Sequence, residues 1–134
     1  MREIIIASHG DFSKGIKHMV EMIAGQQKNI TTYSLVEGEA ATDFADILSK
    51  KVEENPTKEY VILTDLYGAS VCSAMLALKK YDNVHLFAGT NMNLIMELIF
   101  MPVPLQPKDI EYLVECGRQG ISYVEVVQNE DEDF

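Results

Sequence analysis

Residues 1–10 read MREIIIASHG, and this stretch decides the fold class. Residues 3–8 contain three consecutive isoleucines and no apolar–polar alternation, which is typical of a strand buried on both faces. Such strands belong to parallel sheets that helices cover on both sides. The strand runs directly into His9 and Gly10, so a histidine is expected at the carboxyl end of a buried strand.

The rest of the chain alternates strand and helix patterns. Further strands are predicted over residues 30–36, 60–64, 84–88 and 121–127, and helices over residues 12–23, 44–52, 70–79, 94–99 and from 107 to 117 or 120. Short connections between them predict an α/β fold, an open doubly wound sheet with four parallel strands in the order 2-1-3-4. We expect Ser70 to cap the helix that it begins, and Asn91 or Asn93 to cap the next one.

Composition narrows the functional classes. The 134 residues carry a net charge of −10, which argues against nucleic acid as a partner. The size predicts one domain over residues 1–128, followed by an acidic tail over 129–134. No secretory leader and no membrane span is recognisable, which predicts a cytoplasmic protein. The histidines and two cysteines show no metal-ligand spacing, so neither a metal nor another cofactor is expected.

Polar residues gather where the predicted strands end. Ser8 and His9 end the first strand, the segment Asp65-Leu66-Tyr67-Gly68-Ala69-Ser70 follows the third, and Gly89-Thr90-Asn91 follows the fourth. Ligands of open α/β sheets bind beyond the carboxyl ends of the strands, where the strand order reverses. In the order 2-1-3-4 the first and third strands are neighbours, so we expect His9 and Asp65 to meet at that point.

This combination suits a histidine nucleophile. A carboxylate that accepts a hydrogen bond from one ring nitrogen fixes the tautomer and leaves the other nitrogen free to attack. Gly68, Ala69 and Ser70 open a helix, and the amides of a helix N-terminus bind anions such as phosphate. Transient phosphorylation of His9 fits these groups. Each residue also has an ordinary structural interpretation, as a strand-end histidine, a turn aspartate or a helix cap.

Five segments carry a resemblance to a known family. They are IIIASHG, VEMIAGQQKNI, VEGE, VILTDLYGASVCSA and LFAGTNMNLIMEL. Their order and spacing resemble the IIA component of the mannose-family sugar phosphotransferase system, from the first strand to about Gly120.

The resemblance implies a phosphotransferase component. His9 would accept a phosphoryl group on Nε2 from the histidine phosphocarrier protein and pass it to a histidine of a IIB protein or domain. Asp65 would hydrogen-bond Nδ1, and Ser70 and the amides around Gly68, Ala69 and Val71 would hold the phosphoryl group. The membrane subunits IIC and IID would import the sugar, so the protein would be peripheral to that transporter. The resemblance further implies a homodimer whose last strand is antiparallel and exchanged between subunits.

Partner docking and the pathway are less closely specified. Phe12, Leu66, Tyr67 and Met92 are expected to form an apolar docking rim, with ordinary core packing as the alternative. The chain departs from the family's usual D-T-W-G-G-S-P at Leu66, Tyr67, Ala69 and Val71. Two alternatives therefore stay open: the phosphoryl-donor subunit of a dihydroxyacetone kinase, and a regulatory binding module of the same fold. The transported sugar cannot be read from a subunit that never contacts it.

Overall fold

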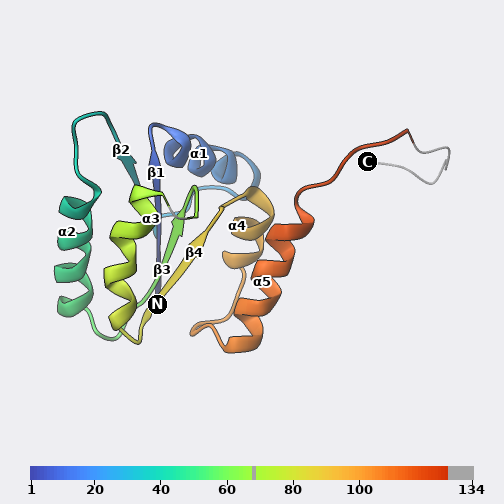
Figure 1. Ribbon diagram of the computed structural model, residues 1–134. Helices are drawn as coiled ribbons and strands as arrows, with labels where there is room; N and C mark the ends of the chain where they lie inside the picture. Colours follow the sequence, from blue (N-terminus) through green and yellow to red (C-terminus); the bar gives the residue numbers. More distant parts are fainter. Residues whose placement is uncertain (68, 127–134) are drawn as a thin grey trace.

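A computed structural model describes residues 1–67 and 69–126. Its parallel sheet has four strands in the order β2-β1-β3-β4 (Figure 1), which confirms the predicted topology: β1 (Arg2–His9), β2 (Ile30–Leu35), β3 (Glu59–Thr64) and β4 (Val84–Ala88). The order reverses between β1 and β3. The carboxyl ends of these two strands, which carry His9 and Asp65, therefore lie side by side at the switch point.

Helices cover both faces of the sheet (Figure 1). Their bounds are α1 (Phe12–Ala24), α2 (Ala41–Glu54), α3 (Ser70–Met75), the 3₁₀ helix η1 (Leu76–Lys80), α4 (Met92–Leu98) and α5 (Pro107–Gln119). Side chains of α1, α4 and α5 pack on one face of the sheet, and those of α2, α3 and η1 pack on the other.

The first strand explains the two-sided core. Ile4 and Ile6 pack toward α1, α4 and α5, whereas Ile5 packs toward α2 and α3. All three are at most 1% exposed, and full burial of such a side chain stabilises the fold by about 1.5–3 kcal/mol. The unbroken isoleucine run is therefore the consequence of a central strand with apolar neighbours on both sides.

Helix starts and ends differ in part from the predictions. Asn91 caps α4, because its side chain accepts a hydrogen bond from the amide of Leu94 at 3.1 Å. Ser70 is not a cap: Ala69 holds the cap position of α3, and Ser70 is the first residue of the helix. The predicted helix over 70–79 is also divided into α3 and η1.

The C-terminal segment forms no strand within its described part. Residues 121–126 have no regular secondary structure and are exposed, so the predicted fifth strand is not formed by the single chain. Val127 of that predicted strand and the predicted tail over 129–134 lie outside the described residues, as does Gly68. No helix within residues 1–67 and 69–126 is long and apolar enough to cross a membrane.

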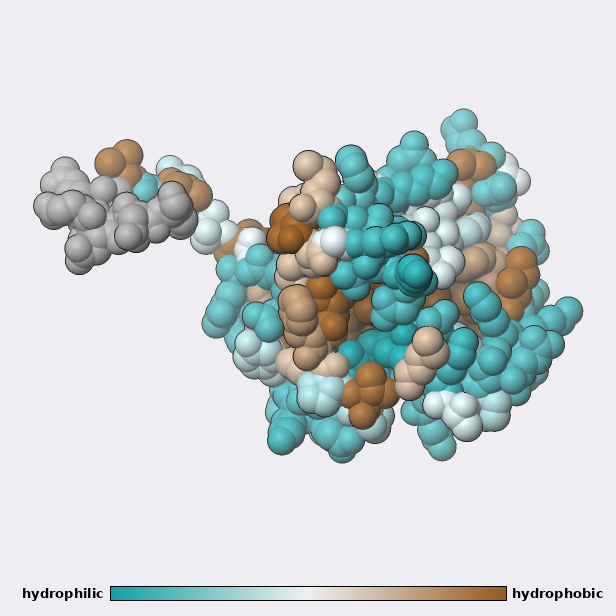
Figure 2. All heavy atoms as spheres, turned by 180° about the vertical axis from the view of Figure 1, so that it is seen from behind, coloured by the Kyte–Doolittle hydropathy of each residue, from teal (hydrophilic) through white to brown (hydrophobic). Residues whose placement is uncertain are grey.

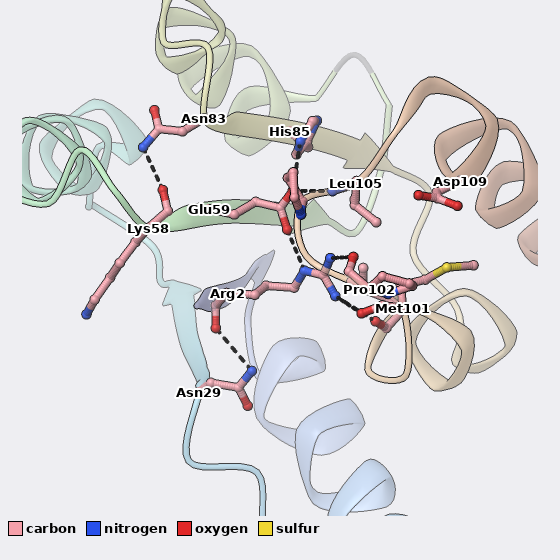
Figure 3. Close-up of polar contacts among 12 residues, drawn as sticks. Arg2, Asn29, Lys58, Glu59, Asn83, His85, Met101, Pro102, Leu105 and Asp109 are labelled. Atoms are coloured by element: carbon pink, nitrogen blue, oxygen red, sulfur yellow. Dashed lines mark hydrogen bonds and ion pairs between the residues drawn. The ribbon is translucent and has the colours of Figure 1, made fainter.

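A buried polar cluster holds the opposite end of the sheet from His9 (Figure 3). Arg2 Nε donates to Glu59 Oε1 at 2.7 Å. The other nitrogens of the Arg2 guanidinium donate to three backbone carbonyls at and after the C-terminus of α4, those of Leu98, Met101 and Pro102. Glu59 Oε2 accepts from the amide of Leu105 at 2.6 Å and lies 3.2 Å from Nε2 of His85. Since Arg2 and Glu59 are about 5% exposed, the cluster ties the α4–α5 connection to β1 and β3.

Candidate functional site

His9 meets a carboxylate on one side of its ring and a hydroxyl on the other. Nδ1 lies 3.0 Å from Asp65 Oδ2, and Nε2 lies 3.2 Å from Ser70 Oγ. The same Asp65 oxygen accepts a hydrogen bond from the backbone amide of His9 at 2.9 Å. Asp65 therefore contacts both the main chain and the ring of His9, and it can hold the ring in one orientation.

Each of these side chains comes from a different part of the fold. His9 is the last residue of β1, Asp65 directly follows β3, and Ser70 begins α3. The end of β3 is fixed by the carbonyl of Thr64, which accepts from the amides of Gly89 and Thr90, both at 3.1 Å, and from the Thr90 hydroxyl at 2.7 Å. The β4–α4 connection thus fixes the residue that precedes Asp65.

The hydrogen-bonding chemistry selects one ring tautomer. An ionised carboxylate can only accept, so Nδ1 carries the proton that is donated to Asp65. In the neutral ring, Nε2 then has a free lone pair, and Ser70 can donate its hydroxyl proton to it. The His9 side chain is 45% exposed and that of Asp65 is 16% exposed. Nε2 therefore carries an oriented lone pair on a partly exposed ring.

One oxygen of the site has no partner. Asp65 Oδ1 is buried and accepts no hydrogen bond in the described part of the chain, whereas Oδ2 accepts from the backbone amide and from Nδ1 of His9. Within residues 1–67 and 69–126, the hydrogen bonds of the Asp65 carboxylate thus all come from His9. A carboxylate with this arrangement is suited to stabilise positive charge on the imidazole ring.

The structure describes three of the four expected phosphate-binding residues. Gly68 lies outside the described residues, while Ala69 and Ser70 stand at the start of α3. Val71 is fully buried, and its side chain packs with Ala7 and Ala41. Val71 can therefore contribute only its backbone amide to an anion at this helix start.

The expected docking residues differ in how far they are exposed. Phe12, Leu66 and Tyr67 are 44%, 58% and 84% exposed, whereas Met92 is half-buried and packs against the core. Phe12 and Met92 line one apolar groove of about 380 Å³ between α1 and the start of α4. Tyr67 lines another groove of about 350 Å³ beside β4. Phe12 and Met92 thus share one apolar groove, and Tyr67 belongs to another.

Sequence reasoning did not identify the residues behind the site. Ser13 lies at helical spacing with Ile16 and Val20, so it falls on the buried face of α1. A serine at such a position could have been recognised as a buried hydroxyl that needs a hydrogen-bond partner. Ser8 and Thr90 stood among the strand-end residues, but their hydrogen bonds were not predicted: Ser8 bonds across the following turn to Ser13, and Thr90 bonds to the end of the neighbouring strand β3. Within residues 1–67 and 69–126 no three His, Cys, Asp or Glu side chains are grouped as a metal site.

Comparison with known proteins gives consistent matches. The family model described as "PTS system fructose IIA component" matches residues 3–111. The chain is 25% identical over 112 residues to the "PTS system fructose-specific EIIA component" of Bacillus subtilis, covering 82% of this chain and 77% of the relative. It is 30% identical over 98 residues to the "PTS system sorbose-specific EIIA component" of Lacticaseibacillus casei, covering 72% and 70%.

A solved structure matches over nearly the whole chain. The crystal structure of phosphotransferase system component EIIA from Streptococcus agalactiae superposes with a TM-score of 0.79 and 26% identity. The superposition covers 92% of this chain and 97% of that one, so the two proteins share the arrangement of sheet and helices.

Proposed function

The chain belongs to the IIA components of the mannose-family sugar phosphotransferase system, and on this premise we propose that His9 carries a phosphoryl group between two other proteins. The donor is the histidine phosphocarrier protein, and the recipient is a histidine of a IIB protein or domain. The observation that carries the proposal is the contact of Asp65 Oδ2 with Nδ1 at 3.0 Å, which leaves Nε2 as the free nitrogen.

The transfer needs one bond to form and one to break. The Nε2 lone pair of His9 attacks the phosphorus of the donor's phosphohistidine as the donor's N–P bond breaks. The electron pair of that bond returns to the donor's ring nitrogen. The proton on Nδ1 stays in place, so the phosphorylated ring of His9 is cationic and faces the Asp65 carboxylate. In the second transfer, a ring nitrogen of the IIB histidine attacks the phosphorus as the bond from Nε2 of His9 to phosphorus breaks. The electron pair of that bond returns to Nε2.

Positioning and electrostatics supply the rate acceleration. Phosphoryl transfer proceeds through a loose transition state with charge spread over the equatorial oxygens, so oriented donors and in-line geometry are what the protein contributes. Ser70 Oγ, at 3.2 Å from Nε2, is placed to donate to one of these oxygens. The amides that open α3, from Gly68 to Val71, are the further donors that we assign to the phosphoryl group.

The setting follows from the family's role. The docking rim that we assign to these partners is formed by Phe12, Leu66, Tyr67 and Met92, of which the first three are exposed. The protein works in the cytoplasm, peripheral to the membrane subunits IIC and IID, and nucleic acid is not among its partners. The two relatives are described as fructose-specific and sorbose-specific components. For this chain, the sugar that is phosphorylated depends on the IIB partner that receives the phosphoryl group.

We also assign the C-terminal segment to a homodimer interface. β4 pairs only with β3 among the described strands, so its other edge is open. Ile121, Tyr123, Val124 and Val126 are 80–95% exposed, and Figure 2 shows exposed apolar side chains on the side from which this segment extends. The segment would pair antiparallel with β4 of a second copy. Light scattering of the full chain should give twice the chain mass, and Val124→Glu should shift it toward the monomer.

The phosphorylation proposal is tested by labelling. The chain is incubated with radiolabelled phosphoenolpyruvate and the two general proteins of the phosphotransferase system. We expect an acid-labile, base-stable label, as a phosphoramidate requires, that is lost in His9→Ala. His18→Ala is the matched control, because His18 is an exposed histidine of α1. A label that persists in His9→Ala contradicts the proposal.

A second assay identifies the recipient. The labelled chain is mixed in turn with candidate IIB proteins and with the other subunits of a dihydroxyacetone kinase, and loss of label is followed over time. Rapid transfer to a IIB protein supports the sugar-transport role. Transfer to the kinase subunits alone would instead favour the phosphoryl-donor alternative, and no transfer to any partner would favour a regulatory module.

A further inference from the structure

Two fully buried serines lie directly behind His9, and the proposed transfer uses neither of them. Ser8 precedes His9 in β1, Ser13 lies in the first turn of α1, and both are 0% exposed. A buried hydroxyl destabilises the fold unless it is hydrogen-bonded, so its bonds indicate what it does. We propose that Ser8 is a positioning residue that holds the His9 turn in the geometry that phosphoryl transfer needs; this inference rests on the proposed function.

The Ser8 hydroxyl joins both ends of the turn. It accepts a hydrogen bond from the backbone amide of Ser13 at 2.8 Å and donates to the carbonyl of Gly10 at 3.3 Å. The amide of Ser13 is one of the first amides of α1, which have no partner within the helix. Asp11 occupies the cap position but makes no side-chain cap bond, so Ser8 supplies the cap from the strand.

The same turn is attached to the neighbouring strand β2. The Ser13 hydroxyl donates to the carbonyl of Tyr33 at 3.0 Å and lies 3.2 Å from the Ser34 hydroxyl. The amide of Gly10 donates to the carbonyl of Leu35 at 2.8 Å. Gly10 has a φ of +54°, a left-handed conformation that glycine adopts without steric cost. The turn after His9 is therefore held from two sides. Hydrogen bonds to β2 hold one side, and the Ser8 hydroxyl connects the other side to β1, the strand that ends in His9.

These contacts determine where the His9 ring can lie. The ring is 45% exposed and touches only Asp65 and Ser70 through its nitrogens, so its position depends on the backbone beneath it. Without the Ser8 hydroxyl the amide of Ser13 is buried without a partner, and the turn must move to expose it. A misplacement of about 1 Å at a reacting group can slow a reaction by about a hundredfold.

The test measures transfer and ring geometry in matched variants. In Ser8→Ala we expect the first-order transfer rate at saturating phosphocarrier protein to fall about tenfold or more, with an unchanged KM for that protein. In ¹⁵N spectra of the ring, the Nδ1–H tautomer of wild type should give way to a mixture. Ser8→Thr keeps the hydroxyl and should recover the rate to within about threefold. Ser49→Ala is the matched control, because it removes a partly buried serine hydroxyl that contacts Tyr81, on the other face of the sheet from the His9 turn and α1, and both readouts should stay at wild-type values.

The outcomes separate this proposal from the proposed function. If wild type is not labelled at all, the proposed function fails, and the ring spectra alone then decide whether Ser8 positions His9. If wild type is labelled and folded Ser8→Ala matches it in rate and ring spectrum, only the positioning role is overturned. Should Ser8→Ala not fold, Ser8→Cys takes its place, since its thiol keeps the shape and accepts hydrogen bonds weakly. A wild-type rate and spectrum in Ser8→Cys would equally overturn the proposal.

Discussion

Replacement of Asp65 by asparagine isolates the charge that orients His9. Asparagine keeps the shape of the side chain and one acceptor oxygen, but it removes the carboxylate that contacts the His9 amide at 2.9 Å and Nδ1 at 3.0 Å. A hydrogen bond to a charged group contributes about 1.5–3 kcal/mol. Each 1.36 kcal/mol of lost transition-state stabilisation slows a reaction about tenfold, so we expect transfer to His9 to slow about ten- to a hundredfold.

Rapid-quench measurement of a single turnover gives this rate directly. Phosphorylated phosphocarrier protein is mixed with an excess of wild type or Asp65→Asn, and the label on His9 is followed in time. Asp11→Asn is the matched control: it makes the same change in net charge at the same edge of the sheet, but Asp11 is 84% exposed and pairs only weakly with Lys14. A rate for Asp65→Asn within about twofold of wild type would refute the orienting role of the carboxylate.

Three further predictions concern the site and the fold. Ser70→Ala should slow labelling of His9 about two- to tenfold, as the loss of one neutral hydrogen bond of about 0.5–1.5 kcal/mol implies; an unchanged single-turnover rate would exclude Ser70 from the site. Glu59→Ala leaves the buried guanidinium of Arg2 without its ion pair and should lower the free energy of unfolding by about 3–5 kcal/mol, measured by urea denaturation; a loss below about 1 kcal/mol would contradict the structural role of the cluster. Burial and neighbouring carboxylates raise the pKa of Tyr60 above its ordinary value, so the unfolded chain releases this proton first as the pH rises. Stability should therefore decline above about pH 10, and Tyr60→Phe should reduce that decline in thermal melts recorded across this range.

The sequence predicted the sheet because periodicity is a local signal. The unbroken apolar character of residues 3–8 and 60–64 reports burial on both faces, and this alone identifies central parallel strands. Ligands bind beyond the carboxyl ends of such strands, and this rule was enough to predict that His9 and Asp65 are neighbours. Asn91 was likewise predictable as a cap, because its partner lies three residues away.

Other features depended on contacts between distant residues. Ser70 was predicted both to cap its own helix and to contact the phosphoryl group; Ala69 holds the cap position instead, and the Ser70 hydroxyl lies 3.2 Å from Nε2 of His9, 61 positions away in the chain. The 57 positions between Arg2 and Glu59 gave no sign of their ion pair. Strand formation by residues 121–126 is not decided within one chain, because a strand needs a partner edge.

The sequence by itself thus determined the four strands of the sheet, their order and which side chains end them, because these follow from burial patterns within a few residues. Only the tertiary structure decided that the Ser70 hydroxyl lies beside Nε2 of His9, that Ser13 bonds to β2, and how Arg2 and Glu59 hold the far end of the sheet. Hydrogen bonds of this kind require atoms within about 3 Å of each other, and that proximity exists only after strands distant in sequence have paired in one register.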